Sequence, residues 1–212
     1  MERLLNPFFT SRNVGVEYFN SLAHNRMSVA GGWFNDWWSK GTPYDTSSNH
    51  YTTRVTFLPV KSEDGSSYLH FAFSTRWIGA TNGTLQLTGR PESNVTSPYV
   101  DTGKFPANSS ANYGFEALAN SGPVSFLAEY IYATTDAPQV GSPHFYGGYL
   151  TGSWVITGEN RPYDTSVAYA RRIIPRNRYG AWEIIGRIGR LDLTSKAIQG
   201  GSQNSYSGGL SW

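Results

Sequence analysis

Apolar and polar side chains alternate along residues 180–193, as they do along a β-strand whose two faces meet different surroundings. One face would carry Trp182, Ile184, Gly186 and Ile188. The other face would carry Glu183, Ile185, Arg187 and Gly189. An apolar face opposite a charged one suits a wall between hydrocarbon and water, so the segment predicts a strand of a transmembrane β-barrel.

Eight further segments show this alternation between turn signals, and together they predict about nine strands. These segments are residues 13–20, 26–36, 50–58, 67–78, 112–119, 124–133, 145–157 and 205–212. Residues 67–78 are the clearest, with one expected face made of Leu69, Phe71, Phe73 and Trp77. No helix longer than a turn or two is expected. The predicted fold class is all-β with antiparallel strands.

The connections between these segments alternate in length, as they do in outer-membrane barrels with short periplasmic turns and long external loops. The short ones are residues 20–26, 59–66 and 120–123, and the long ones are 37–49, 79–111 and 134–144. Residues 158–179 form a long connection where a short turn is expected. We therefore expect this connection to be a candidate for folding into the lumen.

Composition supports one domain with unusually few charges. The chain has 212 residues, of which 15% are charged and 15% aromatic, against about 25% charged in soluble domains. A secreted carbohydrate-binding β-sandwich shares this composition, and the Trp37-Trp38 pair could stack on a sugar. A structural outer-membrane barrel with a plugged lumen is the other alternative.

Several classes of function are excluded or disfavoured. A net charge of +2 without a basic run gives no reason to expect a nucleic-acid partner. The chain has no cysteine, which excludes disulfides and cysteine-based metal sites. The four histidines show no metal-site spacing, and no nucleophile elbow or P-loop context occurs. We expect no enzyme activity, no metal and no cofactor.

The two ends of the chain suggest an internal fragment. The first seven residues lack the apolar core of a secretory signal, and residues 205–212 stop within a strand-like segment. We expect residues 1–212 to form a single partial β-barrel domain that lacks the first strands and the last ones. Its expected shape is an open curved sheet instead of a closed cylinder.

Four motifs resemble the phosphate-selective porin O and P family. Residues 180–193 are similar to its "GAWE…R…RLDL" strand, and residues 148–150 with 157–163 to its "GxY…TGExRxY" pattern. Residues 90–92 with 100–103 resemble an external loop, and 208–212 the start of a "GLNW" strand. The resemblance covers most of residues 90–212. It implies a sixteen-stranded, trimeric porin in the outer membrane of a Gram-negative bacterium, in contact with lipid and passing small anions such as phosphate.

Face assignment gives the candidate pore-lining residues. They are Arg54, Arg76, Arg187, Glu116, Glu129 and Glu183. A pore selects anions by presenting positive charge in a narrow passage of low dielectric constant. The alternative is that these residues form lateral ion pairs that stiffen the wall, because balanced charges cancel at a distance.

A second candidate is the basic connection at residues 158–179. It contains Arg161, Arg171, Arg172, Arg176 and Arg178, against only Glu159 and Asp164. If it folds inward, these arginines would form a positive constriction. Alternatively, it is a solvated periplasmic segment with no role in selectivity.

Overall fold

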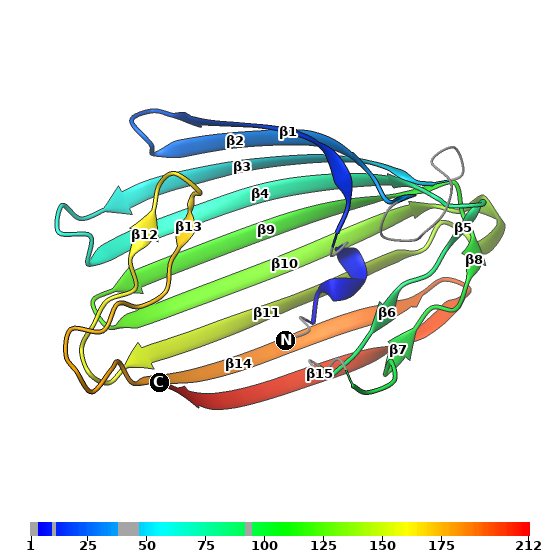
Figure 1. The fold of residues 1–212 in the computed structure, drawn as a ribbon. Coiled ribbons are helices and arrows are strands. Elements are labelled where there is room, and N and C mark those ends of the chain that lie inside the picture. Colours follow the sequence, from blue (N-terminus) through cyan, green and yellow to red (C-terminus); the bar gives the residue numbers. More distant parts are fainter. Residues whose placement is uncertain (1–3, 10–11, 38–46, 92–94) are drawn as a thin grey trace.

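The computed structural model describes residues 4–9, 12–37, 47–91 and 95–212. Nine antiparallel strands form one sheet in which each strand pairs with the next long strand along the chain (Figure 1). They are β1 (Val14–Leu22), β2 (Met27–Asn35), β3 (Asn49–Lys61), β4 (Ser67–Gly79), β9 (Ser109–Ser121), β10 (Val124–Asp136), β11 (His144–Val155), β14 (Glu183–Ser195) and β15 (Ile198–Ser211). The predicted all-β class is confirmed.

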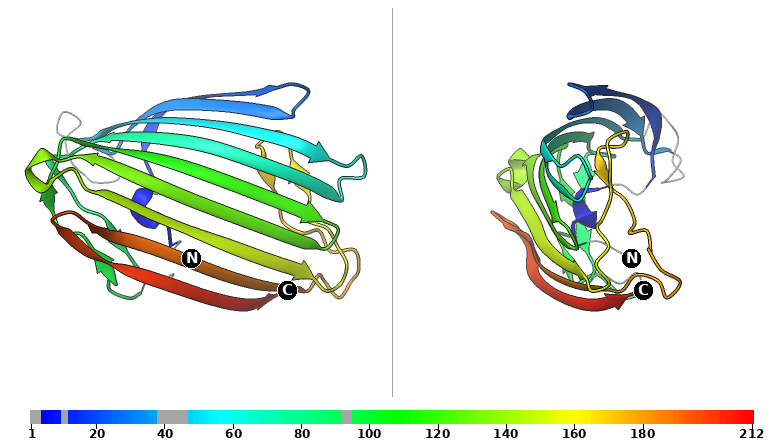
Figure 2. Two further views of the ribbon diagram at one scale, coloured as in Figure 1. Left: turned by 180° about the vertical axis from the view of Figure 1, so that it is seen from behind. Right: turned by 90° about the vertical axis from the view of Figure 1, so that its left-hand side faces the viewer.

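The sheet is curved and open, as predicted. β1 and β15 are its two edges, and Figure 2 shows a trough-shaped wall with the N-terminal segment on its concave side. Residues 38–46 and 92–94 lie outside the described part of the chain. Trp38 of the suggested sugar-stacking pair and Glu92 of the loop motif therefore cannot be placed.

The largest error in the predicted strand boundaries concerns β15, and the other boundaries differ from the prediction by three residues or fewer. β15 begins at Ile198, seven residues before the predicted start at residue 205, and a tight turn at Lys196 joins it to β14. Residues 199–204 are glycines and polar residues, so apolar alternation could not reveal the strand there. The β14–β15 connection is short at the end where the other connections are long.

The convex face is apolar, and its large side chains are exposed. Phe71, Phe73 and Trp77 are 45%, 40% and 41% exposed, and no second layer covers them in the described part of the chain. Neighbouring strands place such side chains side by side, with 5.1 Å between the ring centroids of Phe73 and Phe115. The predicted two-sided wall is present, and residues 4–9, 12–37, 47–91 and 95–212 do not form a sandwich of two packed sheets.

Aromatic residues border the convex face at both ends of the strands. Tyr51 and Trp77 pair near the long loops, with ring centroids 5.7 Å apart. Trp182 and Trp212 pair at the opposite end, at 6.2 Å. At the usual rise per residue, Tyr146 to Trp154 spans about 26 Å along β11, close to the height of an apolar band with aromatic girdles.

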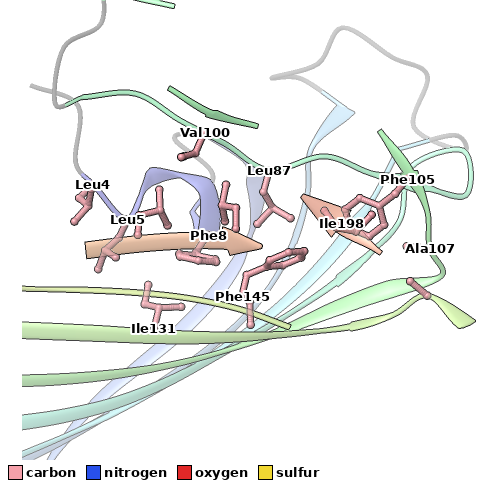
Figure 3. Close-up of a cluster of buried hydrophobic side chains, with 14 of the residues drawn as sticks. Leu4, Leu5, Phe8, Leu87, Val100, Phe105, Ala107, Ile131, Phe145 and Ile198 are labelled. Carbon is pink, nitrogen blue, oxygen red and sulfur yellow. The ribbon is translucent and has the colours of Figure 1, made fainter. Parts of the chain in front are cut away.

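The main hydrophobic core lies on the concave side, which sequence analysis did not predict. A 3-10 turn, η1 (Asn6–Phe8), brings Leu4, Leu5 and Phe8 onto Ile131 and Phe145 of the wall (Figure 3). The connection between β4 and β9 also turns inward, and it adds Leu87, Val100, Phe105 and Ala107 to this core. Two short strand pairs form within this connection. β5 (Thr84–Leu85) pairs with β8 (Phe105–Pro106), and β6 (Thr88–Gly89) pairs with β7 (Val100–Asp101).

Two smaller elements lie in the connections between the long strands. The 3-10 turn η3 (Pro138–Val140) connects β10 to β11, and β12 (Tyr163–Asp164) pairs with β13 (Tyr169–Ala170) in a hairpin. Among the described residues, no helix is both long and apolar enough to cross a membrane.

Candidate pore interior

A hollow of about 760 Å³ lies on the concave side of the sheet. The N-terminal segment borders it through Phe8 and Phe9, and the tip of the β12–β13 hairpin borders it through Val167 and Tyr169. The wall of the hollow comes from β1 to β4, β9 and β10. Its charged lining residues are Glu17, Arg54, Arg76, Glu116 and Glu129.

Arg54 and Glu116 form an ion pair across this wall. The Arg54 Nη2 atom lies 3.3 and 3.2 Å from the two carboxylate oxygens of Glu116. Glu116 also lies 3.2 Å from Nε2 of the buried His70. The guanidinium and the carboxylate therefore compensate each other, as the wall-stiffening interpretation expects.

Arg76 holds the N-terminal segment in the lumen. Its Nη1 donates to the backbone carbonyl of Phe8 at 2.8 Å, and Asn112 Nδ2 donates to the same oxygen at 2.9 Å. Its Nη2 lies 2.6 Å from Nδ1 of His50, whose Nε2 is 3.7 Å from a carboxylate oxygen of Asp36. Both Asp36 and His50 are buried, so Arg76 is part of a compact charged cluster.

Glu129 and Arg187 both contact the side chain of Tyr149. Glu129 stands opposite Glu116 in the β9–β10 register and hydrogen-bonds the hydroxyl of Tyr149. The Arg187 guanidinium lies 4.5 Å from the centre of the Tyr149 ring, and its Nε donates to Thr151 at 2.9 Å. The two charges are thus connected through Tyr149.

The β12–β13 hairpin lies on the concave face, over β3, β4 and β9 (Figure 1). The Tyr163 hydroxyl is 2.7 Å from Nδ1 of His70, and the Tyr163 ring lies 5.0 Å from that of Tyr68. Tyr163 also packs on Leu58 and Leu118. Burial raises the pKa of Tyr163 from its ordinary value of 10.0 to about 12.

The five arginines of this connection have different surroundings. Arg161 pairs with Glu183 at the start of β14, and Arg171 pairs with Asp164 at 2.8 Å. Arg176 donates through its backbone N–H to Glu159 at 3.1 Å, and Arg178 donates to the Tyr179 hydroxyl at 2.6 Å. Arg172 is exposed. The segment is less positive than its arginine count suggests.

Asp164 makes the hairpin turn sensitive to strong acid. Its carboxylate accepts hydrogen bonds from the Ser166 hydroxyl and, at 2.9 Å, from Arg171 Nε, and these bonds lower its pKa to about 2. Because the folded pKa lies below the ordinary value of 3.8, this stabilisation is present above about pH 4 and lost as pH falls through about 2. Hydrogen-exchange protection of residues 164–171 should fall between those values. Asp164→Asn should remove this dependence, and constant protection in the unmodified protein would contradict the prediction.

Two glycines allow the N-terminal segment to approach the wall. A Cβ at Gly189 would lie 2.5 Å from Leu4 Cδ2, and one at Gly147 would lie 2.9 Å from Leu5 Cδ2. Real Cβ atoms do not show such contacts, so a larger residue at either position would force the leucine side chain to move. The wall and the segment are therefore shaped for each other.

Sequence reasoning found the charged wall residues but missed the groups that fill the lumen. All six candidate wall residues lie on the concave face, although their role in selectivity stays a prediction. The burial of Leu4, Leu5 and Phe8 in the lumen was not predicted. The proline in Asn6-Pro7 is nevertheless typical of the start of a short helical turn. His50 and His70 show no metal-site spacing in the sequence, and in the structure they contact Arg76 and Tyr163. Among the described residues, no cluster of potential metal ligands occurs.

Comparison with known proteins identifies the family. The family model for phosphate-selective porin O and P matches residues 3–212. An uncharacterised protein of Caulobacter vibrioides is 26% identical over 155 residues, which are 70% of this chain and 31% of that protein. The chain thus spans less than a third of this relative's length. Given the two-sided antiparallel wall and the match over nearly its whole length, the chain belongs to the phosphate-selective porin O and P family.

Proposed function

We propose that these strands form part of the wall of an outer-membrane porin, through which small hydrophilic solutes diffuse passively. The main support is that the two faces of the sheet differ. The convex face exposes apolar side chains, whereas the concave face is lined by Arg54, Glu116 and Glu129. Such a wall replaces a costly passage through hydrocarbon by a polar one, with no bond broken and no cofactor.

The partners are outer-membrane lipid of a Gram-negative bacterium on the convex face and, in the full-length protein, two further copies in a homotrimer. Family membership supports the membrane environment. The test is conductance of the full-length protein in planar bilayers, where steps of ion current are expected.

Anions such as phosphate are the proposed solutes. The support is the family description together with Arg172 and Arg178, which are exposed at the turn end of the lumen. Positive charge at a pore mouth raises the local concentration of anions.

Neutralising the basic connection should weaken anion preference. We expect the triple variant Arg171→Gln, Arg172→Gln and Arg176→Gln to lower the anion-to-cation permeability ratio about twofold, since it removes three positive charges. Reversal potentials across a salt gradient measure this ratio. The matched control is Arg190→Gln, because Arg190 lies on the convex face and should not affect the ratio. An unchanged reversal potential in the triple variant would reject a role for this segment.

A plugged structural barrel is the second candidate, favoured by the apolar core that Leu4, Leu5 and Phe8 form inside the lumen. It predicts a bilayer without current for a fully folded protein. The presence of the hollow beside that core favours the open channel.

A further inference from the structure

The hollow has a lining that is unusual for a water-filled pore. Phe9 and Phe19 both line it, and they are 47% and 42% exposed. The lumen of a porin is ordinarily polar, and large apolar side chains facing water mark binding surfaces. Val167 and Tyr169 of the hairpin add to this apolar part of the lining.

The charges in the hollow do not suit a free anion. Among the described lining residues, three are carboxylates, and two are guanidiniums that already have partners. Arg54 is bound to Glu116, and Arg76 is bound to the Phe8 carbonyl. Inorganic phosphate carries one or two negative charges at neutral pH, so the three carboxylates would repel it.

Hydroxyl groups fit the same lining well, because each one can donate and accept. Carboxylates accept from them, and the neutral hydroxyl groups of the wall both donate and accept. Such hydroxyl groups in the lining include Thr52 and Ser74. A sugar ring combines such hydroxyls with an apolar ring face that can lie against an aromatic side chain.

We infer that the hollow is a binding subsite for a neutral, polyhydroxylated ring of the size of one or two sugar units. This inference rests on the proposed channel function and adds neutral sugars as a second class of solute for the channel. Its volume of about 760 Å³ is in the range of small-molecule sites. Phe9 and Phe19 contact the ring face, and the Arg54–Glu116 pair contacts hydroxyls.

The test uses the full-length protein in planar bilayers with maltose as the probe. Maltose should block the ion current in a saturable manner after correction for bulk conductivity, and inorganic phosphate should block it less. Phe9→Ala and Phe19→Ala should each weaken the block about fivefold and leave the reversal potential unchanged, since neither changes a charge. Phe126→Ala is the matched control, because Phe126 lies on the convex face away from the hollow and should leave the block intact.

The outcomes separate the subsite from the channel. Ion current without saturable maltose block, block that survives both variants, or stronger block by phosphate would each overturn the subsite and leave the porin standing. A silent bilayer would reject the channel, and isothermal titration of the folded protein in detergent with maltose then decides the subsite by binding or its absence. Heat-modifiable migration on gels establishes that each variant is folded.

Discussion

Replacing Phe73 by arginine is expected to destabilise the barrel by about 2–4 kcal/mol, the cost of a cationic side chain in the middle of the lipid-facing band. Phe73 lies between the two aromatic borders on the convex face, beside Phe115. Its replacement would place a charge against hydrocarbon and remove an aromatic contact. The measurement is denaturant unfolding of the full-length protein in lipid vesicles, followed by tryptophan fluorescence.

The adjacent residue provides the matched control. Ala72 lines the hollow and stands opposite Glu116 in the register. Arginine at position 72 would point into water near a carboxylate, so Ala72→Arg should cost less than about 1 kcal/mol. Equal losses for the two variants would contradict the assignment of the convex face to lipid.

Replacing Phe8 by alanine should release the N-terminal segment from the lumen. Phe8 is fully buried between the wall and the inward-folded connection, and truncating such a side chain costs about 3–5 kcal/mol. That loss reduces the ratio of docked to undocked segment by at least about a hundredfold. We expect larger single-channel conductance, or flickering between two levels, and faster proteolysis near residues 4–9.

Phe9 gives the comparison for this variant, because it is the same residue type one position later and half exposed. Phe9→Ala should leave the single-channel conductance in plain salt within about 20% of the parent, since little apolar surface becomes uncovered. Conductance that is unchanged in Phe8→Ala would mean that the segment does not narrow the channel.

The sequence predicted the wall because the wall follows a rule with period two. Leu69, Phe71 and Phe73 face away from His70 and Ala72 whatever the rest of the chain does, so alternation placed them correctly. The rule fails where both faces are polar. In residues 199–204 both faces of the strand carry glycine or polar side chains, so alternation could not reveal the first part of β15.

The contents of the lumen could not be predicted in this way. Leu4 and Leu5 pack closely against Gly189 and Gly147, which lie more than 140 residues later in the sequence. The placement of Arg76 on the concave face followed from alternation, whereas its bond to the Phe8 carbonyl depends on where a distant segment docks. Pairing partners of this kind come from tertiary contacts and have no local signal.

The strictly sequential order of the strands has a consequence for how this wall is built. Each strand pairs with the next long strand in the chain, so the nascent sheet can be extended hairpin by hairpin, and the entropic cost of closing even the two longest connections grows only slowly with their length. Leu5 and Leu191, which lie near opposite ends of the chain, are buried in the same hydrophobic cluster. This contact cannot form before β14 has been added, so the N-terminal segment should reach its final position only after most of the wall is in place.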